Sequence, residues 1–157
     1  MSRRGLIQMS DDEVRAYLNA SKTIILTSNG PGGYPHPMPM WFGIDQDGTI
    51  RMTTFRASQK VSNLKRDPRV SLLVESGEEY SELMGVVFYG KAEVIDDIDA
   101  VTKTLISAST RGQPPLTPEA REGMAKVMAK TASKRVCILL KPERVVSWDH
   151  RKLGGTY

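Results

Sequence analysis

Residues 34–44 read YPHPMPMWFGI, and this stretch decides how the rest of the chain is interpreted. Its prolines occupy every second position, at 35, 37 and 39. Residues two apart in an extended strand direct their backbone groups to the same side, so all three missing N–H donors fall on one edge. The other edge keeps its donors. The pattern predicts either an edge strand protected from aggregation or a stiff strand against which a flat heterocycle lies.

The segments around this stretch predict an all-antiparallel arrangement. Apolar and β-branched runs bounded by turn residues predict about seven strands, over 23–27, 34–44, 49–55, 69–74, 85–94, 136–140 and 145–148. Helices are expected over 11–20, 58–66, 97–109 and 117–132. The first helix begins with a capping box formed by Ser10 and Glu13. Because strands and helices do not alternate, we expect a mainly β (α+β) fold, an antiparallel barrel with peripheral helices.

Length and composition favour one ordinary globular domain. The chain has 157 residues, of which 39% are hydrophobic and 25% charged, and it holds no apolar run of 18 residues. We expect a single domain over 1–157, with a core at 10–148 and a tail at 149–157. The lone cysteine, Cys137, predicts a small core residue, and with only two histidines we expect no metal site. A cytoplasmic location is the default expectation.

The net charge of +4 is distributed in blocks. Residues 51–74 hold six basic groups and one acid, for a net charge of +5. Residues 76–99 hold seven acids and one lysine, for a net charge of −6, and residues 134–157 have a net charge of +4. Aromatic residues make up only 6%, whereas a nucleic-acid surface usually spreads its cations and interleaves aromatics. We therefore expect a small anionic ligand, with neither nucleic acid nor membrane as a partner.

The run Arg56-Ala57-Ser58-Gln59-Lys60 is the candidate anion site. It lies where a strand ends and a short helix begins, and a helix start offers free N–H groups and a positive dipole end. Arg56 can fork onto two phosphate oxygens, and Lys60 adds a point charge. The alternative is that Ser58 only caps the helix and that both cations are solvated.

These segments together resemble a known family. The proline strand, the Phe55–Lys60 run and the stretch Asn63-Leu64-Lys65-Arg66-Asp67-Pro68-Arg69-Val70 are similar, in order over residues 10–148, to the flavin and deazaflavin split-barrel family of pyridoxamine 5′-phosphate oxidase. The resemblance implies an FMN-binding type of split β-barrel that works as a homodimer with the cofactor at the interface.

The resemblance also implies a set of cofactor-binding residues. Pro39, Met40 and Trp41 would lie along the ring of the cofactor. Arg56, Ser58 and Lys60 would bind its phosphate, with Asn63 nearby. The closing strand of the partner would contribute Trp148. No catalytic residue is implied, but Tyr80, Tyr89 and His36 are candidate proton donors.

Departures from the family decide between its branches. Pyridoxamine phosphate oxidases are longer and end in an Arg-Leu-x-Pro motif, which the end of this sequence at residues 152–157 lacks. The compact length resembles the branch that uses coenzyme F420. This implies a reductase that transfers a hydride between F420 and an organic substrate. An FMN-binding oxidase-like protein, a non-catalytic cofactor carrier and a basic interaction module are the alternatives.

Overall fold

The computed structural model describes residues 4–154 and contains seven strands within that range. The strands are β1 Thr23–Asn29, β2 Pro35–Ile44, β3 Ile50–Phe55, β4 Arg69–Ser76, β5 Met84–Ile95, β6 Arg135–Leu140 and β7 Arg144–Asp149. They pair in the order β4-β1-β2-β3-β6-β5-β7, and an additional pairing of β4 with β5 closes six of them into an antiparallel barrel. β7 lies outside this closure, paired to the first half of β5. The predicted antiparallel split barrel is therefore confirmed.

The helices match the sequence pattern closely. They are α1 Arg4–Ile7, α2 Asp11–Ala20, α3 Gln59–Arg66, α4 Ile98–Ser109 and α5 Pro118–Ala132, with short 3₁₀ turns η1 Pro31–Gly33, η2 Tyr80–Glu82 and η3 His150–Leu153. The capping box is present, since the Ser10 side chain accepts from the Glu13 N–H while the Glu13 carboxylate accepts from the Ser10 N–H. α1 and the 3₁₀ turns were not predicted, because three or four residues show no periodicity. The predicted tail extends beyond the described residues at 155–157.

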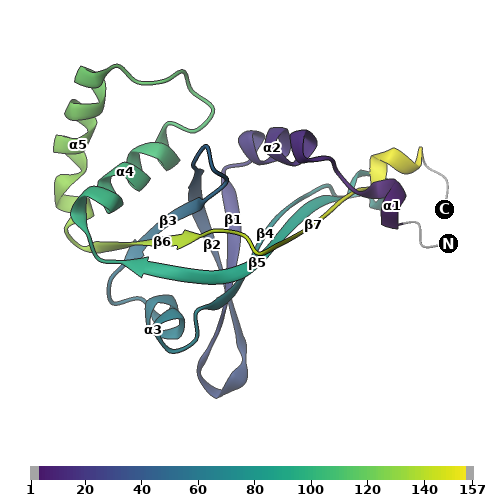
Figure 1. Ribbon diagram of the computed structural model, residues 1–157, viewed down its shortest axis with the longest axis horizontal. Helices are drawn as coiled ribbons and strands as arrows, with labels where there is room; N and C mark the ends of the chain where they lie inside the picture. Colours follow the sequence, from purple (N-terminus) through teal and green to yellow (C-terminus); the bar gives the residue numbers. More distant parts are fainter. Residues whose placement is uncertain (1–3, 155–157) are drawn as a thin grey trace.

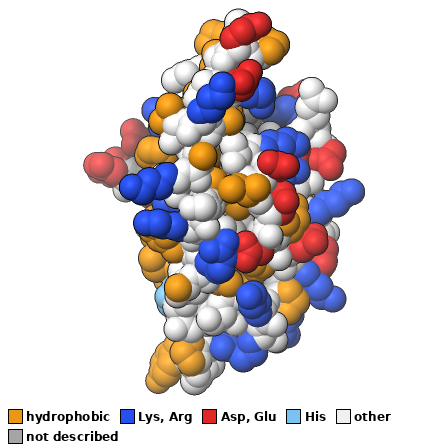
Figure 2. Space-filling model, turned by 90° about the vertical axis from the view of Figure 1, so that its left-hand side faces the viewer, with side chains coloured by type: hydrophobic (Ala, Val, Ile, Leu, Met, Phe, Trp, Pro, Cys, Tyr) orange, Lys and Arg blue, Asp and Glu red, His pale blue; other side chains and the backbone are white. Residues whose placement is uncertain are grey.

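Figure 1 shows how these helices surround the barrel. α4 and α5 form a hairpin at one end of the molecule, and α4 packs on β2, β3 and β6. α1 and η3 lie together at the opposite end. Figure 2 shows Lys, Arg, Asp and Glu side chains interspersed over the α4–α5 end of the molecule. No described helix is long and apolar enough to cross a membrane.

The three alternating prolines explain why the barrel is split. β2 pairs with β1 over seven successive positions, from Asn29↔Pro35 to Thr23↔Trp41. It pairs with β3 only at positions 42–44, beyond the last proline. Because a proline has no N–H to donate to a ladder, the edge of β2 that carries the three prolines faces away from β1. Along this proline segment β2 and β3 do not pair with each other. The sequence prediction of one normal and one incomplete edge is confirmed.

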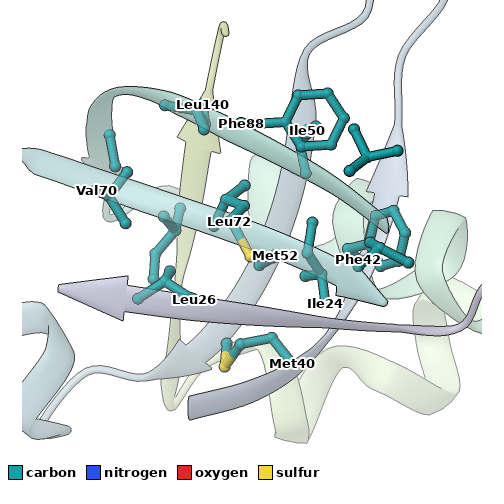
Figure 3. Packing of buried hydrophobic residues seen from close by; sticks show 14 of the residues in the cluster. Ile24, Leu26, Met40, Phe42, Ile50, Met52, Val70, Leu72, Phe88 and Leu140 are labelled. Carbon is teal, nitrogen blue, oxygen red and sulfur yellow. The ribbon is translucent and has the colours of Figure 1, made fainter. Parts of the chain in front are cut away.

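Alternation along the strands builds the core. Ile24, Leu26, Met40, Phe42 and Met52 are buried and point into the barrel, where they meet residues of β4, β5 and β6 (Figure 3). The intervening positions of β1 and β2 point outward, as expected from the two-residue period of a strand. Cys137 is fully buried between β6 and α4, where its Sγ lies 3.1 Å from Thr104 Oγ1.

One row of outward residues crosses five strands. The strand registers join five residues into a continuous line from β2 through β1, β4 and β5 to β7: Pro39, Ile25, Leu73, Val87 and Val146. Pro39 is exposed and the other four are half-buried. We call these five residues the outer apolar row. Its β2 end lies at the split in the barrel.

Candidate functional site

A pocket of about 340 Å³ lies in the split between β2 and β3, with α4 as its second wall. The unpaired part of β2 contributes one side of it, and Thr53 and Thr54 of β3 contribute the floor. The lining residues are Pro39, Met40, Trp41, Thr53, Thr54, Leu105, Ala108, Ser109 and Arg135. The pocket therefore combines a flat, largely apolar wall with a polar end.

The residues predicted to hold the ring do line this pocket together. Pro39 and Trp41 point outward from β2, and Trp41 is 66% exposed despite its size. Met40 is 9% exposed and faces the core, so only its edge reaches the pocket. Across from them, Leu105 and Ala108 of α4 add an apolar surface. A flat aromatic ligand suits such a wall.

Thr53, Thr54 and Arg135 form the polar end of the pocket, and Lys60 lies behind Thr54, buried and without a described carboxylate partner. Its side chain leaves the residue only 7% exposed, and Nζ donates to Thr54 Oγ1 at 3.0 Å. Thr54 Oγ1 also lies 3.1 Å from Ser58 Oγ. Burial, and then the nearby positive charge of Arg135, lower the pKa of Lys60 below its ordinary value. Within residues 4–154, no ion pair involves Lys60.

Ser58 precedes α3 but does not cap it with its side chain. The residue occupies the N-cap position with extended backbone angles, and its hydroxyl makes no capping bond. The hydroxyl instead faces Thr54 and, through it, Lys60. The interpretation of Ser58 as a simple side-chain cap is therefore wrong, and its hydroxyl lies beside Thr54, behind the polar end of the pocket.

Arg56 lies apart from this end, although the sequence placed it there. Its Nε and Nη2 donate to the two carboxylate oxygens of Asp96, each at 2.7 Å. This bond lowers the pKa of Asp96 below its ordinary value. The remaining donors of Arg56 bond to the backbone carbonyls of Ser133 and Arg135. Asp96 comes from the acidic block at residues 76–99.

Arg135 occupies the pocket in the place where Arg56 was expected. Its guanidinium lies over the Phe55 ring, with 4.4 Å between Cζ and the ring centroid. Nη1 makes a long bond of 3.4 Å to Thr53 Oγ1, and the buried Nε has no partner. No described carboxylate pairs with it. The sequence gives no signal for this residue, which reaches the site only through the pairing of β3 with β6.

Two other predicted residues lie outside the pocket. Asn63 is fully buried and joins α3 to β1: its Nδ2 donates to Ser28 Oγ at 3.0 Å, and its Oδ1 accepts from Gln59. Trp148 lies on β7, packed over Gly85 of β5. Both orient the strands around the site in this chain. The three candidate proton donors, Tyr80, Tyr89 and His36, do not line the pocket.

A second, more open hollow of about 590 Å³ lies at the turn between β1 and β2. It is lined by Asn29, Gly30, Pro31, Gly32, Gly33, Arg66, Asp67 and Arg69. Arg69 is paired with Asp67 at 2.7 Å, which holds the pKa of that carboxyl far below its usual range. Its guanidinium charge is thus already compensated by that carboxylate.

Comparison with known proteins identifies the family of the chain. The family model described as pyridoxamine 5′-phosphate oxidase matches residues 10–149, which is most of the chain. The chain belongs to the pyridoxamine 5′-phosphate oxidase family. A search of curated proteins gave no match.

Solved structures share this fold. The conserved hypothetical protein Rv2991 from Mycobacterium tuberculosis is 38% identical, with a TM-score of 0.84 over 100% of this chain and 95% of that chain. A structure titled F420 reductase has 22% identity and a TM-score of 0.57, over 83% of this chain and 94% of its own. The heme storage protein HutZ from Vibrio cholerae has 16% identity and a TM-score of 0.61, over 87% and 94%. The last two show the fold alone.

Proposed function

We propose that this protein is an oxidoreductase that binds a phosphate-bearing flavin-type cofactor, coenzyme F420 in the first place and FMN as the alternative. The observation that carries the proposal is the buried ammonium of Lys60, bonded only to a hydroxyl. A buried cation without an anion is expensive to maintain, and a bound phosphate would compensate it. The adjoining flat wall at Pro39 and Trp41 suits a tricyclic ring.

The residues present fit such a group. Lys60 would hold the phosphate, and the Ser58 and Thr54 hydroxyls would donate to its oxygens. The β2 segment from Pro39 to Trp41 would lie along the ring, with α4 excluding water from the other side. When bound, the deazaflavin supplies two-electron hydride transfer to or from an organic substrate. The protein's part is to bind, orient and exclude water.

A homodimer would complete the site. The outer apolar row runs from Pro39 beside the pocket to Val146 on β7. Trp148 lies two residues further along β7 on the same face. Packing two such faces about a two-fold axis parallel to the strands brings β7 of one protomer over β2 of the other, and with it Trp148 of the partner subunit to the pocket. We propose that this cytoplasmic protein functions in that form.

A non-catalytic carrier is the second candidate. It is favoured by the absence of a carboxylic acid, histidine, tyrosine or cysteine among the described residues lining the pocket. A hydride acceptor that must also be protonated would then draw its proton from water. The carrier predicts tight cofactor binding without substrate-dependent oxidation of the reduced cofactor.

The test is a titration of the purified protein with F420 and with FMN, followed by cofactor fluorescence. We expect a dissociation constant in the micromolar range or below for one of them, and a loss of about tenfold or more in Lys60→Met. Binding of neither cofactor would overturn the proposal. Binding without turnover across a panel of electron-poor alkenes and nitro compounds would favour the carrier.

A further inference from the structure

We propose that Arg135 is the guanidinium that recognises the phosphate of the cofactor, and that Arg56 is a positioning residue that holds Arg135 in place. This inference rests on the proposed function and assigns its anion specificity to a residue that sequence motifs do not reveal. It reverses the roles expected from the Arg56–Lys60 run.

Four of the five N–H groups of the Arg56 guanidinium already bond within the protein, which leaves one Nη1–H. Both arms of its fork are engaged by Asp96 at 2.7 Å, and Nη1 donates to the Ser133 carbonyl at 3.1 Å. Forking onto a phosphate would require Arg56 to abandon a bidentate carboxylate of equal charge-assisted strength. The exchange would leave Asp96 unpaired beside an incoming anion, and like charges repel.

Arg135 is presented to the pocket with its charge uncompensated. The Phe55 ring supports one face of the guanidinium, and among residues 4–154 its side-chain acceptor is Thr53 Oγ1 at 3.4 Å. The buried Nε has no acceptor within the described part of the chain. Arg135 is close enough to Lys60 that its positive charge lowers the lysine's pKa. Arg135 lines the pocket and Lys60 lies directly behind Thr54 of that lining, so two cations without a described acid partner converge on one place, which suits a phosphate.

Three contacts tie Arg56 to the backbone that carries Arg135. The Arg56 N–H donates to the Lys134 carbonyl at 3.1 Å, and its guanidinium donates to the carbonyls of Ser133 and Arg135. The pairing of Phe55 with Arg135 then starts the β3–β6 ladder. Asp96, which directly follows β5, forms an ion pair with the guanidinium of Arg56 and fixes its position. Arg56 thus fixes where β6 begins and where its first side chain points.

The chemistry favours a phosphate over a carboxylate ligand. The terminal phosphate of FMN presents three oxygens to Lys60, Arg135 and the two hydroxyls of Ser58 and Thr54, whereas a carboxylate presents two. The guanidinium fork matches two phosphate oxygens in one plane, and the ammonium adds a point charge to the third.

The experiment compares FMN with riboflavin, which differ only by the phosphate. The ratio of their dissociation constants measures phosphate recognition separately from ring binding. If the protein binds only the deazaflavin, F420 and its phosphate-free chromophore replace this pair, and the ratio then reports the phosphate together with the acidic tail beyond it. We expect a wild-type ratio of about 100 or more, since each charge-assisted bond is worth about tenfold or more.

Four variants separate the two arginines. Arg135→Met should lower the ratio at least tenfold, and Arg135→Lys should retain part of it. Arg56→Met should weaken the binding of both ligands together and leave the ratio within about threefold of wild type. Arg121→Met, an exposed guanidinium on α5, is the matched control and should change neither constant. Melting curves of each variant report whether it is folded, and Arg135→Lys keeps the test valid if Arg135→Met does not fold.

The outcomes are separable from those of the proposed function. A wild-type protein that binds neither cofactor would overturn both. A wild-type ratio near 1, or an Arg135→Met ratio equal to that of wild type, would overturn only the role of Arg135. A ratio of the two dissociation constants that falls to near 1 in Arg56→Met and stays at the wild-type value in Arg135→Met would show that Arg56 binds the phosphate.

Discussion

Lys60 Nζ donates to Thr54 Oγ1 across 3.0 Å in a site from which solvent is largely excluded, and no described carboxylate balances its charge. Burial of a charged amine with one hydroxyl partner opposes folding, because the hydroxyl replaces only part of its hydration. The protein therefore carries a residue that is unfavourable for its own stability until a ligand arrives.

Replacing this lysine should separate stability from binding. Lys60→Met keeps the length of the side chain and removes the charge, so we expect the melting temperature of the ligand-free protein to rise by about 2–4 °C, which corresponds to roughly 1 kcal/mol in a chain of this size. Cofactor affinity should fall at the same time. Calorimetry with and without cofactor measures both. A melting temperature lowered by the same amount would show that the ammonium stabilises the fold by itself.

The lowered pKa of Lys60 predicts how binding depends on pH. Below that pKa the ammonium is charged and binds phosphate fully; as the pH rises through it, the charge is lost and FMN affinity falls by up to tenfold per pH unit. Below about pH 6 the phosphate itself takes up a proton, and affinity falls again. The check is a series of FMN titrations from pH 5 to pH 10.5.

Lys60→Met provides the control for this profile. It should lose the decline at high pH and keep the decline at low pH, because only the phosphate still titrates. A high-pH decline that is unchanged in Lys60→Met would assign it to another group.

The fold could be predicted from local signals that tertiary structure did not override. The Ser10 and Glu13 side chains satisfy backbone donors within one helical turn, so their sequence spacing is sufficient. A proline has no amide hydrogen wherever it stands in a fold, so the effect of the three prolines on strand pairing does not depend on tertiary context. They therefore predicted both the β1–β2 pairing and the opening towards β3.

The site could be predicted only where its residues are close in sequence. Ser58 and Lys60 could be predicted because both lie at the start of α3. Arg56 and Asp96 are 40 residues apart, so no local sequence pattern predicts that they form an ion pair. Arg135 is an ordinary basic residue at the start of a strand until the β3–β6 register places it over Phe55. The α4 wall likewise depends on how a helix packs across β2.

That packing of α4 on β2 leads to a prediction about Gly43. A Cβ at Gly43 would lie 2.3 Å from Ser107 Oγ and 3.0 Å from Ser107 Cβ, so the glycine lets the helix contact the strand backbone. Gly43→Ala should push α4 outward, cost about 1–3 kcal/mol of stability, and weaken cofactor binding several-fold by widening the pocket. Adding Ser107→Gly should restore both. If the double variant binds no better than Gly43→Ala, the contact does not set the width of the pocket.

Gly85 makes the corresponding prediction for Trp148. A Cβ at Gly85 would lie 2.1 Å from Cζ2 of the Trp148 ring and 2.6 Å from two further ring atoms, which are held by β7 and cannot simply rotate away. Gly85→Ala should therefore unseat Trp148, lower stability by about 1–3 kcal/mol, and disturb the face on which the proposed dimer forms. Gly123→Ala is the matched control, because nothing lies within 4 Å of its added Cβ on α5 and the change should stabilise that helix by about 0.5–1 kcal/mol. Melting curves together with light scattering measure the two effects. Gly85→Ala melting as late as wild type, with its oligomeric state unchanged, would mean that the ring of Trp148 is not fixed against β5 and cannot be the group that a partner subunit presents to the pocket.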